Sequence, residues 1–153
     1  MKTLVIIPAY NEEKSIVRTV KELKKEAKNI DYVIIDDCSK DNTLNICKQN
    51  NFNVIHLEIN LGIGGAVQTG YKYAEKNDYD IAIQMDADGQ HNPKYIPMLI
   101  EKIEEGNDLV IGSRFIEKEG FQSTFIRRMG IKTYSKIIKI FTKKTIFDTT
   151  SRI

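Results

Sequence analysis

The chain has 153 residues, with 23 Lys and Arg against 21 Asp and Glu and a formal net charge of +2 at pH 7. With 41% hydrophobic and 29% charged residues, this composition excludes a disordered chain and suits one globular domain, residues 1–153, with a real core. A net charge this small gives no support for binding of the chain as a whole to nucleic acid or to a membrane. No apolar run reaches the roughly 18 residues of a membrane-spanning helix.

Short apolar runs alternate with amphipathic stretches along the chain, which is typical of an α/β fold with a mainly parallel sheet. The predicted strands are 3–7, 32–35, 53–57, 81–83 and 108–111. The predicted helices are 13–28, 43–50, one that ends near 76, 93–105 and a last one over 123–143. In such a sheet the loops that follow the strands share one edge, where these folds bind ligands.

Two carboxylates follow the predicted strand 81–83 and form the sequence Asp86-Ala87-Asp88-Gly89-Gln90. Acidic groups at the end of a buried strand are costly unless a cation or hydrogen-bond donors neutralise them. Hard oxygen ligands on a tight turn suit Mg²⁺ or Mn²⁺. The alternative is that one Asp caps the next helix and the other is solvated.

Polar loops also follow the first two predicted strands, as PAYNEE (8–13) and DDCSKDNT (36–43). Each alone could be a strand end followed by a helix cap, with Pro8 ending the strand and Asn11 capping the helix. Together with Asp86 and Asp88 they would converge on one sheet edge. A phosphate bridged by a metal ion is the simplest ligand for that edge.

The turn Gly62-Ile63-Gly64-Gly65-Ala66 invites comparison with a dinucleotide-binding fingerprint. That fingerprint follows the first strand, whereas this turn follows the third, and the spacing to the third glycine is wrong. A close approach of the backbone to a ligand, or simply the start of a helix, remain open.

Two features predict a reducing compartment. Cys38 and Cys47 have neither metal-ligand spacing nor a disulfide pattern, so we expect free thiols. The N-terminus enters a predicted strand without the pattern of a signal peptide. We therefore expect the domain either in the cytoplasm or peripherally on the cytoplasmic face of a membrane.

The motifs PAYNEE, IIDDCSKDNT, NLGIGGA, MDADGQH and GSR, in this order, resemble the family 2 glycosyltransferases. The resemblance covers the whole chain and is closest to the polyprenol-phosphate (dolichol-phosphate) mannosyltransferase-like branch. It implies the GT-A fold, a three-layer α/β/α nucleotide-diphospho-sugar transferase fold. The chain ends at Ile153, within an element that begins at Asp148 and continues in relatives, so we expect a C-terminally shortened member.

The resemblance also implies roles for the matching positions. The nucleotide-sugar pocket would include Pro8, Ala9, Tyr10, Glu12, Asp36, Asp37, Asp86, Ala87 and Asp88. Asp37 would bind the base with support from Asp36, and Asp86 would contact the sugar or ribose. Asp88 and Gln90 would hold Mg²⁺ or Mn²⁺ on the donor diphosphate. The catalytic residues would be Asp86, Asp88 and Arg114, and the acceptor phosphate would contact Arg114, Arg127 and Arg128.

The implied reaction moves a sugar from a UDP- or GDP-linked donor to an acceptor, foremost a polyprenol phosphate, with inversion. A saccharide hydroxyl in cell-surface polysaccharide synthesis is the alternative acceptor, and it would need a carboxylate base. A sugar-nucleotide nucleotidyltransferase would instead carry a glycine-rich basic loop after the first strand, which this sequence lacks. An inactive nucleotide-binding fragment is the remaining hypothesis.

The segment 123–147 is basic and amphipathic, with lysines interleaved among apolar residues. This pattern predicts a helix that lies on an anionic membrane surface. The alternative is that its apolar side packs on the rest of the protein.

Overall fold

The computed structural model describes residues 1–112. The chain divides into two compact units, Met1–Asn107 and Asp108–Ile153. The first unit is described completely and the second only at residues 108–112. A single family domain over residues 1–153 therefore stays a prediction.

The first unit is built on a parallel sheet of four strands in the order β3-β2-β1-β4. The strands are β1 (Thr3–Ala9), β2 (Asp31–Asp36), β3 (Val54–His56) and β4 (Ile81–Gln84). β1 is buried along its whole length, which explains its continuous apolar sequence. Pro8 does not end this strand as expected, because the pairing with β2 continues through Ala9 and Asp36.

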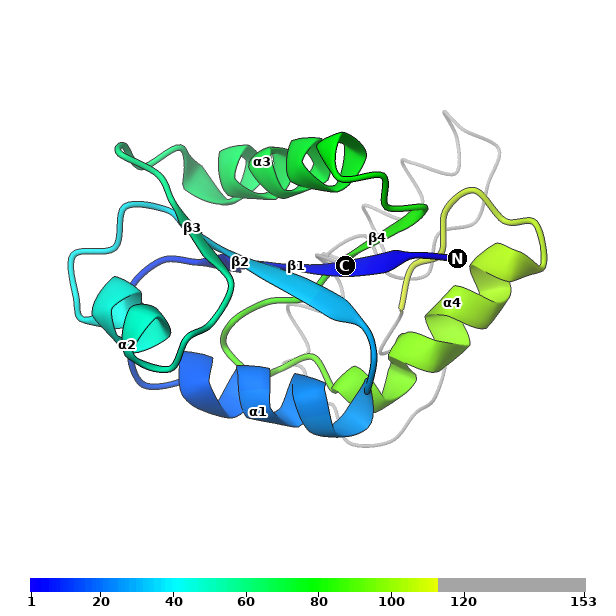
Figure 1. Cartoon of the computed structure of the whole chain (residues 1–153), viewed down its shortest axis with the longest axis horizontal. Coiled ribbons are helices and arrows are strands. Elements are labelled where there is room, and N and C mark those ends of the chain that lie inside the picture. The colour runs from blue at the N-terminus through cyan, green and yellow to red at the C-terminus, as the bar shows by residue number, and fades with distance from the viewer. Residues whose placement is uncertain (113–153) are drawn as a thin grey trace, which may run out of the picture. The chain divides into compact units, whose positions relative to one another are not determined.

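Helices cover both faces of the sheet, as Figure 1 shows. α3 (Gly62–Lys76) lies on one face, and α1 (Ile16–Glu26), α2 (Thr43–Gln49) and α4 (Ile96–Glu104) lie on the other. A short 3₁₀ turn, Pro93–Tyr95, precedes α4. The predicted three-layer α/β/α arrangement is confirmed in this unit.

Alternate residues of the central strand face different cores. Val5 and Ile7 pack with α1, and with Ile96 of α4. Leu4 and Ile6 pack with Ala66 and other residues of α3. This alternation is what the period of two in a strand requires when both faces are covered.

Further differences from the prediction concern α1, the glycine-rich turn and the strand 108–111. α1 begins at Ile16 rather than at residue 13, because residues 13–15 form a turn. The glycine-rich turn is the first turn of α3 itself, which begins at Gly62. The predicted strand 108–111 is not formed: Leu109 is 76% exposed and residues 108–112 carry no strand. Among residues 1–112 this run has no pairing partner, and a strand needs one.

The segment 123–147 lies outside the described residues. Within residues 1–112, no helix is both long enough and apolar enough to cross a membrane.

Candidate active site at the strand-end edge

The candidate site lies where β1, β2 and β4 end. The loops that follow these strands span residues 10–15, 37–42 and 85–92. Because the strands are all parallel, the three loops leave the same edge of the sheet. The predicted convergence of the polar loops is therefore confirmed.

Asn11 joins the first two loops. Its backbone has a φ of 58°, in the left-handed region that Asn tolerates better than most residues. Its side-chain Oδ1 accepts hydrogen bonds from the backbone N–H groups of Lys40 and Asp41, at 2.8 and 3.3 Å. Asn11 therefore does not cap α1, as the sequence suggested, since the capping position is Ser15.

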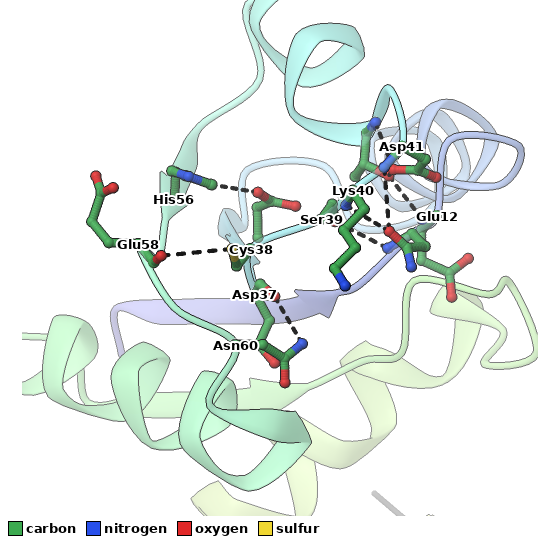
Figure 2. Close-up of polar contacts among 12 residues, drawn as sticks. Glu12, Asp37, Cys38, Ser39, Lys40, Asp41, His56, Glu58 and Asn60 are labelled. Atoms are coloured by element: carbon green, nitrogen blue, oxygen red, sulfur yellow. Dashed lines mark hydrogen bonds and ion pairs between the residues drawn. The ribbon is translucent and has the colours of Figure 1, made fainter.

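The next two residues, Glu12 and Glu13, extend this connection. The N–H of Glu12 donates to the hydroxyl of Thr43 (2.8 Å), and the N–H of Glu13 donates to Asp41 Oδ2 (3.1 Å). Figure 2 shows Glu12 beside the turn that carries Ser39, Lys40 and Asp41. We call residues 10–13 and 37–43 the interlocked loops. Their geometry is fixed by bonds between them rather than by each loop alone.

The carboxylate of Asp41 is the acceptor at the centre of these bonds. Partial burial alone would raise its pKa, but hydrogen bonds from the hydroxyl and N–H of Thr43 and from the N–H of Glu13 lower the pKa. The stabilisation that Asp41 gives the loops is present above the pKa of the unfolded carboxyl. It is lost as pH falls through the lowered pKa.

Asp37 is held in place by the segment that leads into α3. It is 3% exposed, and its Oδ1 accepts a hydrogen bond of 2.7 Å from the N–H of Leu61. The side chain of Asn60 donates to the carbonyl of Asp37 at 3.1 Å, as Figure 2 shows. Asn60 was not predicted as a site residue, because this contact joins loops 23 residues apart.

Asp36 is a buried support beneath this loop. Its side chain is 0% exposed, and its Oδ2 lies 2.6 Å from Nδ1 of His56 on the neighbouring strand. Within the described residues, its other oxygen, Oδ1, has no hydrogen-bond partner. Burial, together with the charge of Asp36, raises the pKa of the Cys47 thiol to about 11. His56 was not predicted as a partner of Asp36, because no local sequence pattern marks it.

The acidic loop, residues Asp86–Gln90, has a different construction. Asp86 accepts a hydrogen bond from the side-chain amide of Gln84 (3.3 Å), and its N–H donates to Nδ1 of His91 (3.0 Å). Asp88 Oδ1 accepts from the N–H of Gln90 at 2.8 Å. Gly89 lies between them with a φ of 77°, which an L side chain rarely adopts. This turn leaves Asp88 Oδ2 and the Gln90 side chain without a protein partner among residues 1–112.

α1 supports the acidic loop from below. The hydroxyl of Thr19, which is 2% exposed, donates to the carbonyl of Ala87 at 2.9 Å. The guanidinium of Arg18 lies against Gly89, where an added Cβ would be 2.7 Å from Nη2. Thr19 was not predicted as a site residue. The sign of it in the sequence is a polar residue on the apolar stripe of α1, between Ile16 and Val20.

The acidic loop fits a divalent cation that arrives with a phosphate ligand. Within residues 1–112, no three His, Cys, Asp or Glu side chains form a complete metal cage. Mg²⁺ and similar hard cations commonly take one or two protein carboxylates and complete their shell with phosphate oxygens and water. Asp88 and Gln90 supply oxygen donors of the required kind at the rim of the edge.

The other predicted site residues occupy varied positions. Pro8 and Ala9 are buried in β1, and Tyr10 is 42% exposed at the strand end. The Glu12 carboxylate accepts a hydrogen bond from the hydroxyl of Ser15. The side chain of Ala87 packs in the core beneath the sheet, so only its backbone faces the loop. The three predicted arginines, Arg114, Arg127 and Arg128, lie outside the described residues.

Comparison with protein families and curated relatives identifies a consistent group. The model of the family described as "Glycosyl transferase family 2" matches residues 4–152. An undecaprenyl-phosphate mannosyltransferase of Micrococcus luteus is 36% identical over 119 residues, which are 74% of this chain and 49% of the relative. A UDP-N-acetylglucosamine–dolichyl-phosphate N-acetylglucosaminyltransferase of Methanococcus voltae is 42% identical over 138 residues, 78% of this chain and 54% of the relative.

Solved structures show the same fold. TarS residues 1–349 of S. aureus, in complex with UDP, aligns with a TM-score of 0.57 and 32% identity over 69% of this chain and 32% of that chain. The mannosyltransferase PcManGT of Pyrobaculum calidifontis, in complex with GDP-Man and Mn²⁺, aligns with a TM-score of 0.54 and 19% identity. That alignment covers 61% of this chain and 29% of the other. The chain spans about half the length of the curated relatives described above.

Proposed function

The chain belongs to glycosyl transferase family 2, and on this premise we propose that it transfers a sugar from a nucleotide-diphosphate donor to a polyprenol phosphate. The predicted family and the GT-A type of fold are confirmed. Two relatives named for transfer to undecaprenyl phosphate and dolichyl phosphate support the choice of acceptor. We place the protein peripherally on the cytoplasmic face of the membrane that holds such a lipid.

The observation that carries this proposal is the pairing of two unlike acidic regions at one sheet edge. Asp37 is buried and oriented by Leu61 and Asn60, which suits recognition of a nucleobase by hydrogen bonds. The acidic loop keeps Asp88 Oδ2 open at the end of β4, which suits a charged diphosphate with its cation. A donor of the UDP or GDP type would span both regions.

We assign Asp88 and Gln90 to a Mg²⁺ or Mn²⁺ ion, which when bound would neutralise the negative charge of the leaving diphosphate. Asp86 would bind a hydroxyl of the sugar or ribose. Arg114, Arg127 and Arg128 would bind the acceptor phosphate, because Arg forms paired hydrogen bonds with phosphate oxygens.

The transfer would proceed in one displacement. An oxygen of the acceptor phosphate attacks the anomeric carbon from the side opposite the diphosphate, and the bond from that carbon to the diphosphate oxygen breaks. The product is a sugar phosphodiester of the lipid with inverted anomeric configuration, together with the nucleoside diphosphate. Because the attacking phosphate oxygen is already anionic, no general base is needed.

The test is transfer with UDP- and GDP-linked hexoses, Mn²⁺ and a short polyprenyl phosphate in detergent, followed by mass spectrometry of the lipid product. We expect a hexosyl phospholipid with one donor class and none with the unphosphorylated polyprenol. Nucleotide binding without any product from either donor class would refute transfer and leave a nucleotide-binding fragment.

A variant separates the two halves of the proposed site. Asp37→Ala should weaken binding of the nucleoside diphosphate both with and without Mn²⁺, since its partner is the base. Calorimetry that shows a loss only in the presence of Mn²⁺ would contradict the assignment of Asp37 to the base.

A further inference from the structure

α1 carries a continuous basic stripe on its solvent side. The stripe includes one residue just before the helix and one just after it. All of its side chains belong to exposed residues at spacings of four, three, four and three: Lys14, Arg18, Lys21, Lys25 and Lys28. Within the helix, Arg18, Lys21 and Lys25 fall within an arc of about 60° at 100° per residue, and Lys14 and Lys28 lie in the turns at its two ends. We call this set the α1 basic stripe.

The packing of α1 fixes the direction of the stripe. The opposite side of the helix is buried against the sheet through Ile16, Val20 and Leu23. The buried side holds the helix in one orientation about its axis. The stripe therefore faces away from the sheet, on the helix that Figure 1 shows below it. Lys24 does not belong to it, because its Nζ leans over the rings of Tyr32 and Phe52 at 5.2 and 5.4 Å.

Two exposed carboxylates of α1, Glu22 and Glu26, lie beside the stripe, against its five basic residues. Lys25 pairs with Glu26 at 3.0 Å, but the lysine side chain is 79% exposed, so this pair is screened and weak. Within the described residues, Arg18 forms no hydrogen bond or ion pair. Its guanidinium lies against Gly89, so one end of the stripe reaches the acidic loop.

We propose that the α1 basic stripe docks the protein on an anionic lipid surface, with the acidic loop at the edge of the contact. This inference rests on the proposed function, because a lipid-phosphate acceptor lies in a membrane. Charge complementarity selects an anionic surface, and each lysine close to such a surface strengthens binding by about fivefold. A nucleic acid fits less well, since single-strand sites add stacking aromatics and the stripe contains none.

The test is sedimentation of the full chain with vesicles of 30% phosphatidylglycerol in phosphatidylcholine, and with pure phosphatidylcholine, at 50 and 500 mM NaCl. The variant is Lys21→Gln/Lys25→Gln. The matched control is Lys72→Gln/Lys76→Gln on α3, with the same change of charge and the same spacing at exposed positions of the opposite face. Thermal unfolding and binding of nucleoside diphosphate verify that both variants remain folded.

We expect the wild type to bind the anionic vesicles at low salt only. The α1 variant should bind about 25-fold more weakly, from two lysines at about fivefold each, and the α3 control within about threefold of the wild type. Equal losses in the two variants, or unchanged binding of the α1 variant, would overturn the proposal; the second result would assign docking to another segment. Binding of a labelled oligonucleotide without binding to vesicles would also overturn it. Sugar transfer is not measured, so failure here is distinct from failure of the proposed function.

Discussion

The interlocked loops and the acidic loop lie at the same sheet edge but satisfy their polar groups in different ways. In the interlocked loops, side chains and backbone amides of one loop bond to the other, as Asn11 does with Lys40 and Asp41. In the acidic loop, Asp88 bonds to Gln90 within the loop, and Asp86 bonds to Gln84 and His91 on either side of it. Its contacts with α1 are the Thr19–Ala87 hydrogen bond and the Arg18 contact.

This difference indicates that the two regions have different roles. A region whose donors and acceptors are already paired is preorganised, so a nucleotide can bind it with little cost of ordering. A loop that leaves a carboxylate oxygen open needs a cation or other ligand to neutralise its charge. We therefore expect substitutions that break bonds between the interlocked loops to lower stability, and substitutions in the acidic loop to lower metal-dependent ligand binding with little effect on stability.

The largest effect should come from Asp88→Ala. Removing the open carboxylate should lower the Mn²⁺-dependent affinity for UDP or GDP by more than about 100-fold, since losses of supporting partners alone reach 10–100-fold at metal sites. The melting temperature without ligand should be unchanged. Isothermal calorimetry with and without Mn²⁺ measures the affinity, and an unchanged metal-dependent affinity would remove Asp88 from the metal site.

His56→Ala should act on stability instead. It leaves Asp36 at 0% exposure with neither oxygen paired among the described residues, and we expect a loss of about 2 kcal/mol in the free energy of unfolding. Urea denaturation measures it. Glu58→Ala is the control. Glu58 is exposed, and the bond that it accepts from Cys38 ends on its backbone carbonyl, which the substitution keeps. Equal stability of the two variants would show that Asp36 does not depend on His56.

Two variants separate what the side chain of Asn11 contributes to stability from what its left-handed backbone requires. Asn11→Gly keeps the left-handed backbone accessible but removes the acceptor for Lys40 and Asp41, so we expect a loss of about 1 kcal/mol. Asn11→Ala adds the strain of a Cβ in that region and should cost about 1 kcal/mol more. If the alanine variant were as stable as the glycine variant in urea, the left-handed conformation would not matter.

The smallest effect on stability concerns the two thiols. Because burial and Asp36 raise the pKa of Cys47 to about 11, this thiol resists ionisation in the folded protein at pH 8. We expect iodoacetamide to modify it at least about 100-fold more slowly than in the urea-unfolded chain. Half-buried Cys38 is the internal reference. The same shift destabilises the native state as pH rises from 9 toward 11. Rapid labelling of Cys47 below pH 9 would show that α2 readily opens away from the core.

Much of the fold was predictable because it depends on local patterns. The continuous apolar run of β1 and the stripe of Ile16, Val20 and Leu23 identify a buried parallel strand and its covering helix without any tertiary information. The run 108–111 has the same local pattern, yet forms no strand among the described residues. A strand depends on its partner, which the pattern does not contain.

The candidate site was predictable only in part, for a similar reason. Asp37, Asp86 and Asp88 stand directly after strands, so topology alone brings them to one edge. Asn60 and His56 become relevant only through contacts across about 20 residues of sequence, with Asp37 and Asp36 respectively. Such pairings arise from the register of strands and loops in space, and the residue types of Asn and His give no local sign of them.

The bonds of the interlocked loops and those of the strand that carries the acidic loop differ in sequence separation. This difference affects the order in which the two regions can fold during synthesis. Their hydrogen bonds join residues between Ala9 and Leu61, whereas the strand that carries the acidic loop is tied to Lys2 by a bond from Asp80, across 78 positions. On a ribosome, the first of these regions is translated completely before β4 exists. Contacts of short sequence separation form faster, and N-terminal parts fold first during synthesis. The interlocked loops can therefore take shape on the nascent chain, and the acidic loop joins them once β4 has been added to the sheet.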